Sequence, residues 1–372
     1  MSKSLKTVLS IILAILMVAT LVACGSGGTS TPTAPTADTP AAPEPPPVPE
    51  PPPPADSTPA ADDTAPAAAG HAVFNSPSDF TVGFAIKNRH NAYLIAMSET
   101  MAARADEYGY NLIELNAGGD AAQQQADVED LVAQGVDVIV MDSQDPTVSI
   151  AIADFVAENN IPLFFLNATP DPSCIRVTLV QSNNLLLGVG VGEWVADQMS
   201  GTDIRIGLLS GNPGNMTGYA RRTGFITGLT ERQLEQGNAT NFIVRTQGWG
   251  NWAIEAGLEA AEDMLVGSPD INVIFAENDA MAFGAITAIE NAGRTGEVLV
   301  VGVDGQRLAL EAIERGEYGA TGLNSPIELV NLAMGLMVDY MTGADRNIPV
   351  LINTTPGVAH AGNLADFWDS AF

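Results

Sequence analysis

The chain has 372 residues, of which 15 are Lys or Arg and 44 are Asp or Glu, so its formal net charge is −29. A protein with this excess of acid repels phosphate backbones, which argues against nucleic acid as a partner. Hydrophobic residues make up 46% of the chain, as in a globular protein, and the length suggests two domains. Fourteen of the 24 prolines lie between Pro32 and Pro66, however, so this stretch differs from the rest.

The first 23 residues have the order of a secretory signal peptide. Lys3 and Lys6 precede an apolar stretch over 8–22, and the sequence Leu21-Val22-Ala23-Cys24 follows. These four residues resemble a lipobox, the motif at which bacterial lipoproteins are cut before a cysteine that then carries lipid. A transmembrane anchor is the alternative, although about 15 apolar residues are short for a span of about 20. The folded part is therefore expected on the extracellular face of the membrane, lipid-anchored, or in the periplasm of a Gram-negative source.

Residues 24–78 are predicted to be a disordered tether that begins at the lipidated Cys24. The segment is rich in Gly, Ser and Thr and then in Pro, Ala and Glu, and it has no aromatic residue before Gly70. Such a composition cannot bury enough apolar surface to offset the chain entropy. Runs such as Pro51–Pro54 favour extended polyproline II, so the tether is expected to be semi-rigid. The other cysteine, Cys174, then has no disulfide partner, and the core must stabilise the folded part.

From Phe80 onward, short β-branched runs alternate with longer amphipathic ones. Strands are predicted at 80–86, 110–115, 136–141 and 161–166, with helices at 92–107, 121–134 and 147–159. This order is typical of a parallel sheet with helices on both faces. The pattern restarts with strands at 204–209, 241–246, 271–276 and 298–303 and a helix over 252–265. The sequence therefore predicts an α/β protein with two doubly wound, Rossmann-like lobes.

Ligands of doubly wound sheets bind beyond the carboxyl ends of the strands, and in this sequence those positions are polar or aromatic. Amides, an acid, a guanidinium and aromatic rings suit a sugar, whose hydroxyls donate and accept hydrogen bonds and whose C–H face is apolar. For any one of these residues, a turn, a helix cap or core packing is the alternative. The candidates are Lys87, Asn91, Tyr93, Asn167, Asn215, Arg221, Trp252, Asn278, Asp304 and Asn324.

Two motifs resemble the signature of type I periplasmic sugar-binding proteins, the ribose and glucose/galactose group. They are Phe275-Ala-Glu-Asn-Asp-Ala-Met-Ala-Phe-Gly284 and Val301-Gly-Val-Asp304, and the resemblance covers residues 79–372. Further motifs look closest to the glucose/galactose branch: Ile161–Asn167, Gly211–Gly214 through Arg221, and Asn363–Phe367. The resemblance implies that Tyr93 and Trp252 stack on the ligand and that the other candidates, apart from Lys87, bind its hydroxyls.

The resemblance also implies a hinge of three segments, near Gln181-Ser182, Asn324-Ser325 and Ile352-Asn353. The N-terminal lobe would then comprise residues 79–181 and 325–352, and the C-terminal lobe residues 182–324 and 353–372. Ligand would close the two lobes about this hinge. No counterpart of the glucose branch's calcium loop is found, so neither a metal nor another cofactor is expected.

The candidate site departs from the family pattern at several positions. Asn91 stands where the glucose/galactose proteins have Asp, Asn167-Ala168 where ribose proteins have Asp-Arg, and Asn215 where the glucose branch has His. Lys87 is foreign to the sugar pattern, although autoinducer-2 receptors are similar in placing a lysine there. Our hypothesis is that Lys87 reaches a polar or anionic group of the ligand, and the alternative is a solvated strand end. Asp304 is expected to be the only acid of the cleft.

The predicted function is that of an extracytoplasmic substrate-binding lipoprotein that delivers a monosaccharide to an ABC permease and its ATPase and acts as a monomer. The alternative is a sensory receptor that presents a sugar or autoinducer-2 to a kinase or chemoreceptor. An enzyme is not expected, because only three histidines occur and no nucleophile elbow, zinc-protease motif or phosphate loop is found. Gly188-x-Gly190-x-Gly192 is interpreted as a tightly packed helix start.

Overall fold

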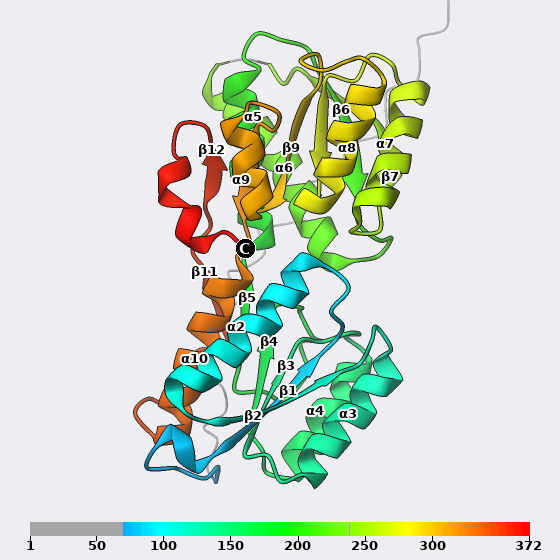
Figure 1. The fold of residues 1–372 in the computed structure, drawn as a ribbon. Coiled ribbons are helices and arrows are strands. Elements are labelled where there is room, and N and C mark those ends of the chain that lie inside the picture. The colour runs from blue at the N-terminus through cyan, green and yellow to red at the C-terminus, as the bar shows by residue number, and fades with distance from the viewer. Residues whose placement is uncertain (1–69, 238) are drawn as a thin grey trace, which may run out of the picture. The chain divides into compact units, whose positions relative to one another are not determined.

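The computed structural model describes residues 70–237 and 239–372, so the predicted signal peptide, Cys24 and tether residues 24–69 lie outside it. The described chain forms two α/β lobes, each built on a six-stranded sheet (Figure 1). The predicted fold class is confirmed. Within the described ranges, no helix is sufficiently long and apolar to traverse a lipid bilayer.

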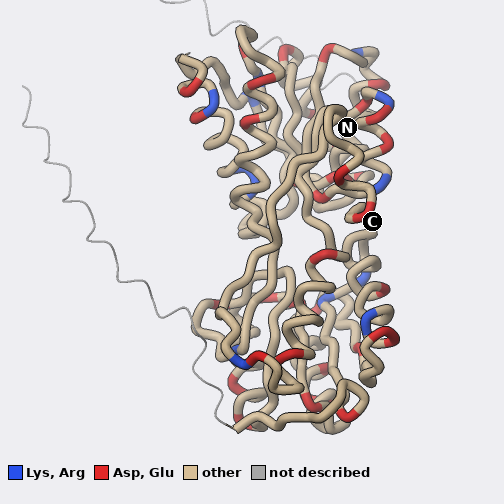
Figure 2. The backbone as a smooth tube through the Cα atoms, turned by 90° about the vertical axis from the view of Figure 1, so that its left-hand side faces the viewer, with Lys and Arg blue, Asp and Glu red and all other residues tan. Residues whose placement is uncertain are grey.

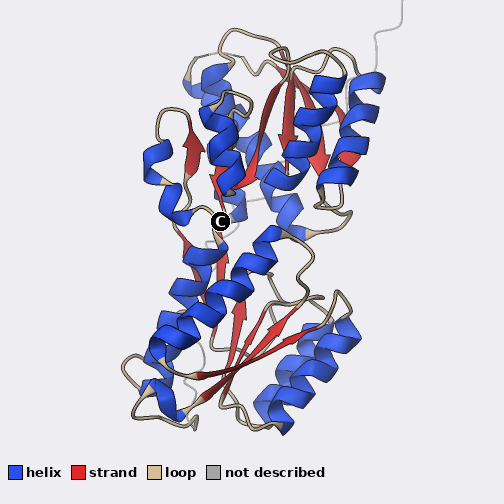
Figure 3. Ribbon diagram, viewed as in Figure 1, coloured by secondary structure: helices blue, strands red, loops and turns tan. Residues whose placement is uncertain are grey.

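The N-terminal lobe has a fully parallel sheet with the strand order β11-β5-β4-β3-β1-β2. Helices α2 (Ala92–Tyr108) and α10 (Pro326–Thr342) cover one face, and α3 (Ala121–Ala133) and α4 (Val148–Glu158) cover the other (Figure 3). Each face therefore buries its own apolar core. The strands are β1 (Thr81–Ile86), β2 (Asn111–Asn116), β3 (Val138–Met141), β4 (Leu163–Leu166), β5 (Thr178–Ser182) and β11 (Leu351–Thr354).

The C-terminal lobe repeats this order as β12-β10-β9-β8-β6-β7, with only β12 antiparallel to its neighbour among the described strands. Helices α5 (Asn184–Gln198) and α6 (Met216–Glu235) pack on one core. Helices α7 (Ile254–Gly267), α8 (Asp279–Asn291) and α9 (Arg307–Glu314) pack on the other. The strands are β6 (Ile204–Ser210), β7 (Phe242–Trp249), β8 (Val273–Ala276), β9 (Leu299–Asp304), β10 (Ala320–Leu323) and β12 (Val358–His360).

Two sequence expectations about helix starts need correction. Helix α7 begins at Ile254 rather than at Trp252, because Asn251 and Trp252 have φ angles of 48° and 60°, which no right-handed helix accommodates. The glycine motif lies in the interior of α5, not at its start. Side chains at Gly188 and Gly192 would overlap backbone atoms of α6, so these glycines let the two helices touch backbone to backbone.

The chain passes between the lobes at three places, after β5, after β10 and after β11. The first two match the predicted positions near 182 and 324. The third lies after Thr354, because β11 stays paired with β5 from Leu351 to Thr354. The C-terminal end returns to this region, where the rings of Phe372 and Tyr93 form a T-shaped pair with centroids 5.5 Å apart.

The last residues assigned to the tether contact the N-terminal lobe. His71 Nδ1 and the hydroxyl of Tyr340 are 2.7 Å apart, and the backbone N–H of Phe74 donates to the carbonyl of Met341 at 2.9 Å. A 3-10 helix, η1 (Pro77–Asp79), leads into β1. The folded part therefore begins several residues before position 79, because aromatic side chains absent from the Pro-rich stretch reappear there and pack on α10.

The acidic residues are spread over both lobes, and fewer basic residues lie among them (Figure 2). Several arginines are held in surface ion pairs, such as Arg232 with Asp197 at 2.8 Å. Two further 3-10 helices, η2 (Leu364–Asp366) and η3 (Trp368–Ser370), close the C-terminal end. The excess negative charge thus belongs to the general surface and not to one patch.

Candidate ligand-binding cleft

A cavity of about 430 Å³ lies at the carboxyl ends of the two sheets and is lined by residues of both lobes. All ten residues predicted from the sequence line it. Parallel strands end at the same edge of their sheet, which is why residues far apart in the sequence meet here. The lining also includes Asn88, His90, Leu94, Gln144, Ala168, Asn212, Thr217, Asn251 and Ala253.

Three of the predicted asparagines cap helices. Oδ1 of Asn91 accepts from the N–H of Leu94 at 3.0 Å, and Asn215 caps α6 in the same way. Asn278 caps α8 and also donates through Nδ2 to the carbonyl of Trp252 at 3.3 Å. Capping takes up the amide oxygen, so Asn91 and Asn215 offer a ligand chiefly their NH2 groups.

Arg221 and Asp304 form a buried ion pair in the C-terminal half of the cleft. Arg221 is 3% exposed, and its Nη1 donates to Asp304 Oδ1 at 2.9 Å and to the carbonyl of Glu277 at 2.6 Å. Its Nε donates to Oδ1 of Asn184 at 2.9 Å. Burial raises the pKa of Asp304, whereas the Arg221 charge and the Asn324 amide lower it. The positive guanidinium is thus neutralised within the protein.

A second buried acid, Asp142, lies on the N-terminal side directly after β3. Its Oδ1 is 3.4 Å from Nζ of Lys87 and accepts from Nδ2 of Asn167 at 3.2 Å and from the N–H of Ala168 at 3.3 Å. Asp304 is the only acid among the described residues that line the cavity, as predicted, and Asp142 lies behind this lining. Lys87 is therefore not simply a solvated strand end, because it is paired with this carboxylate while its side chain also lines the cavity.

Tyr93 links the two halves of the cleft. Its ring is buried in the N-terminal core next to α10, and its hydroxyl lies 3.2 Å from Oδ1 of Asn167 and 3.2 Å from Oδ1 of Asn324. Burial raises the pKa of the phenol far above its usual range, so it stays protonated. The hydrogen bonds to the two asparagines therefore fix the position of the Tyr93 hydroxyl, while the ring is held by the apolar core.

Trp252 is held against the backbone of Gly211. A Cβ atom at Gly211 would overlap the indole ring, so the glycine is required for this close approach. The left-handed backbone at Asn251 and Trp252 turns the chain at the end of β7 and places the ring in the cavity lining. Trp249, the last residue of β7, is 41% exposed and does not line the cavity.

The turn that carries Asp304 is supported by a buried acid on α8. Asp279 Oδ1 accepts from the hydroxyls of Tyr318 and Thr321 at 2.9 and 2.7 Å, and its Oδ2 accepts from the N–H of Gln306 at 2.8 Å. Burial first, and then the charge of Asp304, raise the pKa of Asp279 to about 7. Asp304 itself has a φ of 142°, a strained value for a residue with a side chain.

Sequence reasoning missed the residues that hold the lining in place. Asp142 and Glu277 each directly follow an apolar strand and are almost fully buried, and Asn184 starts α5. An acid placed immediately after a run such as Val138–Met141 is a usable signal, since buried acids need partners. The bond between Asn184 and Arg221 joins helices that are distant in sequence, and no local pattern indicates it.

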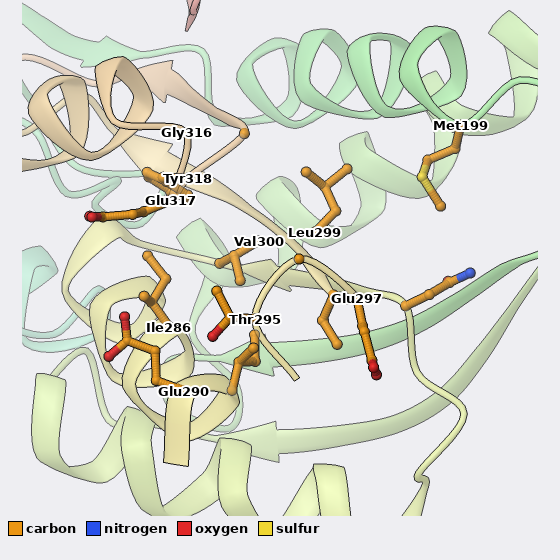
Figure 4. Close-up of a pocket in the computed structure, with 15 residues that line it drawn as sticks. Met199, Ile286, Glu290, Thr295, Glu297, Leu299, Val300, Gly316, Glu317 and Tyr318 are labelled. Carbon is orange, nitrogen blue, oxygen red and sulfur yellow. The ribbon is translucent and has the colours of Figure 1, made fainter. Parts of the chain in front are cut away.

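A second cavity of about 320 Å³ lies in the C-terminal lobe (Figure 4). It is lined by Met199, Ile286 and Leu299 together with acids such as Glu290 and Glu317. None of the predicted site residues lines it. Within 70–237 and 239–372, no cluster of three or more His, Cys, Asp or Glu side chains is arranged to hold a metal ion.

Comparison with known proteins places the chain in a family. Residues 82–345 match the family model for the periplasmic binding protein domain. The ribose import binding protein of Bacillus subtilis (strain 168) is 30% identical over 268 residues, which cover 71% of this chain and 83% of that protein. The chain belongs to the ribose-binding group of type I periplasmic sugar-binding proteins. These are binding proteins and not enzymes, in agreement with the sequence prediction.

Other relatives agree with this placement. The ribose import binding protein of Haemophilus influenzae is 28% identical and covers 76% of this chain and 93% of its own length. An ABC transporter solute-binding protein from Actinobacillus succinogenes 130z, solved with bound D-allose, has a TM-score of 0.71 and 26% identity, covering 77% of this chain and 99% of its own. Some sequence motifs had pointed to the glucose/galactose branch, whereas the relatives named here are ribose and allose binders.

Proposed function

We propose that this chain is the substrate-binding lipoprotein of an ABC importer and that it captures a monosaccharide in the cleft between its lobes. The observation that carries the proposal is the internal pairing of the charges that border the cleft. Arg221 is paired with Asp304 and Lys87 with Asp142, so the charges at the cleft balance one another and the rest of the lining offers mainly amides, hydroxyls and an indole. Such a surface suits a neutral polyhydroxyl ligand better than an anion.

The cavity volume supports a small ligand. A space of about 430 Å³ lies within the usual range of small-molecule pockets. The relatives favour a pentose or hexose, since the Bacillus subtilis protein is named for ribose and the Actinobacillus succinogenes protein holds D-allose. The ten lining residues predicted from the sequence are proposed as the ligand contacts.

Delivery to a permease is proposed from the same relatives, whose names refer to import and to an ABC transporter. They favour transport over presentation of a ligand to a sensor kinase. In this proposal the three crossings between the lobes act as the hinge, and the lipobox-like Leu21–Cys24 anchors the protein outside the cytoplasm. A monomer suffices, because both halves of the cleft come from one chain.

Calorimetry against D-ribose, D-allose, D-xylose, D-galactose, D-glucose, myo-inositol and autoinducer-2 tests the ligand class. We expect micromolar or tighter binding of at least one sugar, together with a rise in melting temperature because ligand binds the folded state. Strongest binding of autoinducer-2 would favour the receptor alternative. If none of these compounds gives heat or a thermal shift, the sugar proposal fails.

Two tryptophans allow a matched test of the site. Trp252→Ala is expected to weaken binding of the best sugar by about 1–3 kcal/mol, the range for burying a large side chain. Trp249→Ala serves as the control, because Trp249 ends the strand that precedes Trp252 and does not line the cavity. Equal affinities of the two variants would remove Trp252 from the site.

A further inference from the structure

Two buried carboxylates lie on opposite sides of the cleft, and each faces one amide. Asp142 Oδ1 accepts from Nδ2 of Asn167 at 3.2 Å, and Asp304 Oδ1 accepts from Nδ2 of Asn324 at 3.0 Å. An ionised carboxylate can only accept hydrogen bonds. The amide beside it must therefore turn its NH2 group toward the acid and its carbonyl oxygen away.

Both amide oxygens turn toward the same phenol. The hydroxyl of Tyr93 is 3.2 Å from Oδ1 of Asn167 and 3.2 Å from Oδ1 of Asn324. A phenol has one proton, so it can donate fully to only one of the two oxygens. The other oxygen keeps its lone pairs in a cavity that all three residues line. The complementary group is a hydrogen-bond donor on the ligand.

We propose that Asp142 is a positioning residue that determines which ligand groups the cleft accepts. By fixing the amide of Asn167, Asp142 keeps the amide oxygen of Asn167 turned toward the cleft as a hydrogen-bond acceptor. A ligand hydroxyl at this position must then act as a donor. This inference rests on the proposed function, since it takes the ligand to be a sugar. Asp142 does not line the cavity and acts through Asn167, while Lys87 beside it supplies a donor.

The surroundings of Asp142 argue against a purely structural role. Its side chain is 0% exposed, yet Oδ2 has no hydrogen-bond partner within the part of the chain that the structure describes. All bonds of the side chain converge on Oδ1. A buried acid with one unused oxygen costs stability, and an uncharged side chain would avoid that cost. Only a carboxylate offers Asn167 acceptors and no N–H or O–H donor, so only a carboxylate forces the NH2 group of Asn167 to point toward it.

Neutron diffraction on the ligand-free, deuterium-exchanged protein tests the orientation directly. We expect the deuterated amino group of the Asn167 side chain (Nδ2 with its two deuterons) to face Asp142, and the side-chain carbonyl oxygen to face Tyr93. The reverse orientation of Asn167 would overturn the inference. This measurement needs no sugar, so it decides the inference even if the proposed function fails.

Fluorinated sugars test the consequence for binding. In the unchanged protein, replacing one hydroxyl of D-ribose or D-allose by fluorine removes a donor and is expected to weaken binding roughly ten- to hundred-fold at the position that meets Asn167. In Asp142→Asn the new amide can donate to Asn167, whose own NH2 can then turn toward the cleft. The penalty at that one position is expected to fall to about three-fold or less, while the penalties at other positions stay.

Asp127→Asn is the matched control for Asp142→Asn. Asp127 is a buried acid of the same lobe, on α3, with one oxygen bonded to Gln123 at 2.7 Å and the other without a partner in the described chain. Asp127→Asn should leave unchanged the loss of affinity that each hydroxyl-to-fluorine replacement causes. A uniform loss of affinity in Asp142→Asn, with the same penalty pattern as the unchanged protein, would show a merely structural role and refute the inference.

Discussion

The two lobes share one strand order, but the residues between their packed helices differ: large side chains in one lobe and glycines in the other. In each lobe, the helix after the first strand packs against the helix that begins where the chain enters from the other lobe. These pairs are α2 with α10 and α6 with α5. Helices α2 and α10 meet through large side chains, including Met97, Met101, Met334 and Met337. Helices α5 and α6 meet through glycines, namely Gly188, Gly192, Gly224 and Gly228.

This difference bears on the cleft, because α2 and α6 each begin at its edge. Gly188 lies against the backbone carbonyl of Arg221, so the helix contact and the buried ion pair share one residue. Tyr93, in the first turn of α2, is packed instead by adaptable methionine side chains. We infer that the C-terminal half of the cleft is a fixed frame and the N-terminal half the more adaptable one.

A large effect is expected from adding a methyl group between α5 and α6. Gly192→Ala would overlap the carbonyl of Phe225, and since a backbone cannot give way, we expect a loss of about 3 kcal/mol or more in the free energy of unfolding. Urea unfolding followed by circular dichroism measures it.

Gly335→Ala on α10 is the matched control in the other lobe. Its nearest neighbour would be the hydroxyl of Tyr108 at 3.7 Å, an ordinary contact. Alanine favours helix over glycine by up to about 1 kcal/mol, so this variant should be neutral or slightly more stable. Similar losses in both variants would show that the two helix pairs are not packed differently.

The lobes were largely predictable because each apolar strand is followed by polar residues, and the parallel order brings those residues to one edge. That logic placed Lys87 and Asn167 in the first lobe and Arg221 and Asp304 in the second, all of which line one cavity. What the residues do there depends on contacts that are distant in the sequence. Three asparagines act as caps, and Lys87 is held by Asp142, because amide and charge partners follow from three-dimensional packing.

The next effect compares the two cation–acid pairs. Arg221→Met should lower the free energy of unfolding by about 3–5 kcal/mol, because Asp304 and the carbonyl of Glu277 lose a buried donor. Lys87→Met should cost less than about 1 kcal/mol, since Lys87 is 24% exposed and makes one contact at 3.4 Å. Burial already raises the pKa of Asp142, which eases its protonation when the lysine is removed.

Both variants can be measured by urea unfolding at pH 7, with the m-value as the check that the unfolding transition is comparable. A Lys87→Met loss as large as that of Arg221→Met would mean that the N-terminal pair is as rigidly built as the C-terminal one. In that case the contrast between a fixed and an adaptable half of the cleft would not hold.

The last effect concerns pH and the buried acid under the fixed half. Asp279 has a pKa of about 7 in the folded protein, whereas an unfolded aspartate titrates near 4. Between these values the folded state holds a proton that the unfolded state has lost, so raising the pH lowers stability, by up to about 1.4 kcal/mol per pH unit from this group. Asp279→Asn removes this contribution and should flatten the decline between pH 5 and 7, although it also loses the bond from Gln306. An unchanged pH slope in the variant, measured by urea unfolding at several pH values, would show that Asp279 is already ionised in the folded protein and that the fixed frame tolerates two buried charges side by side.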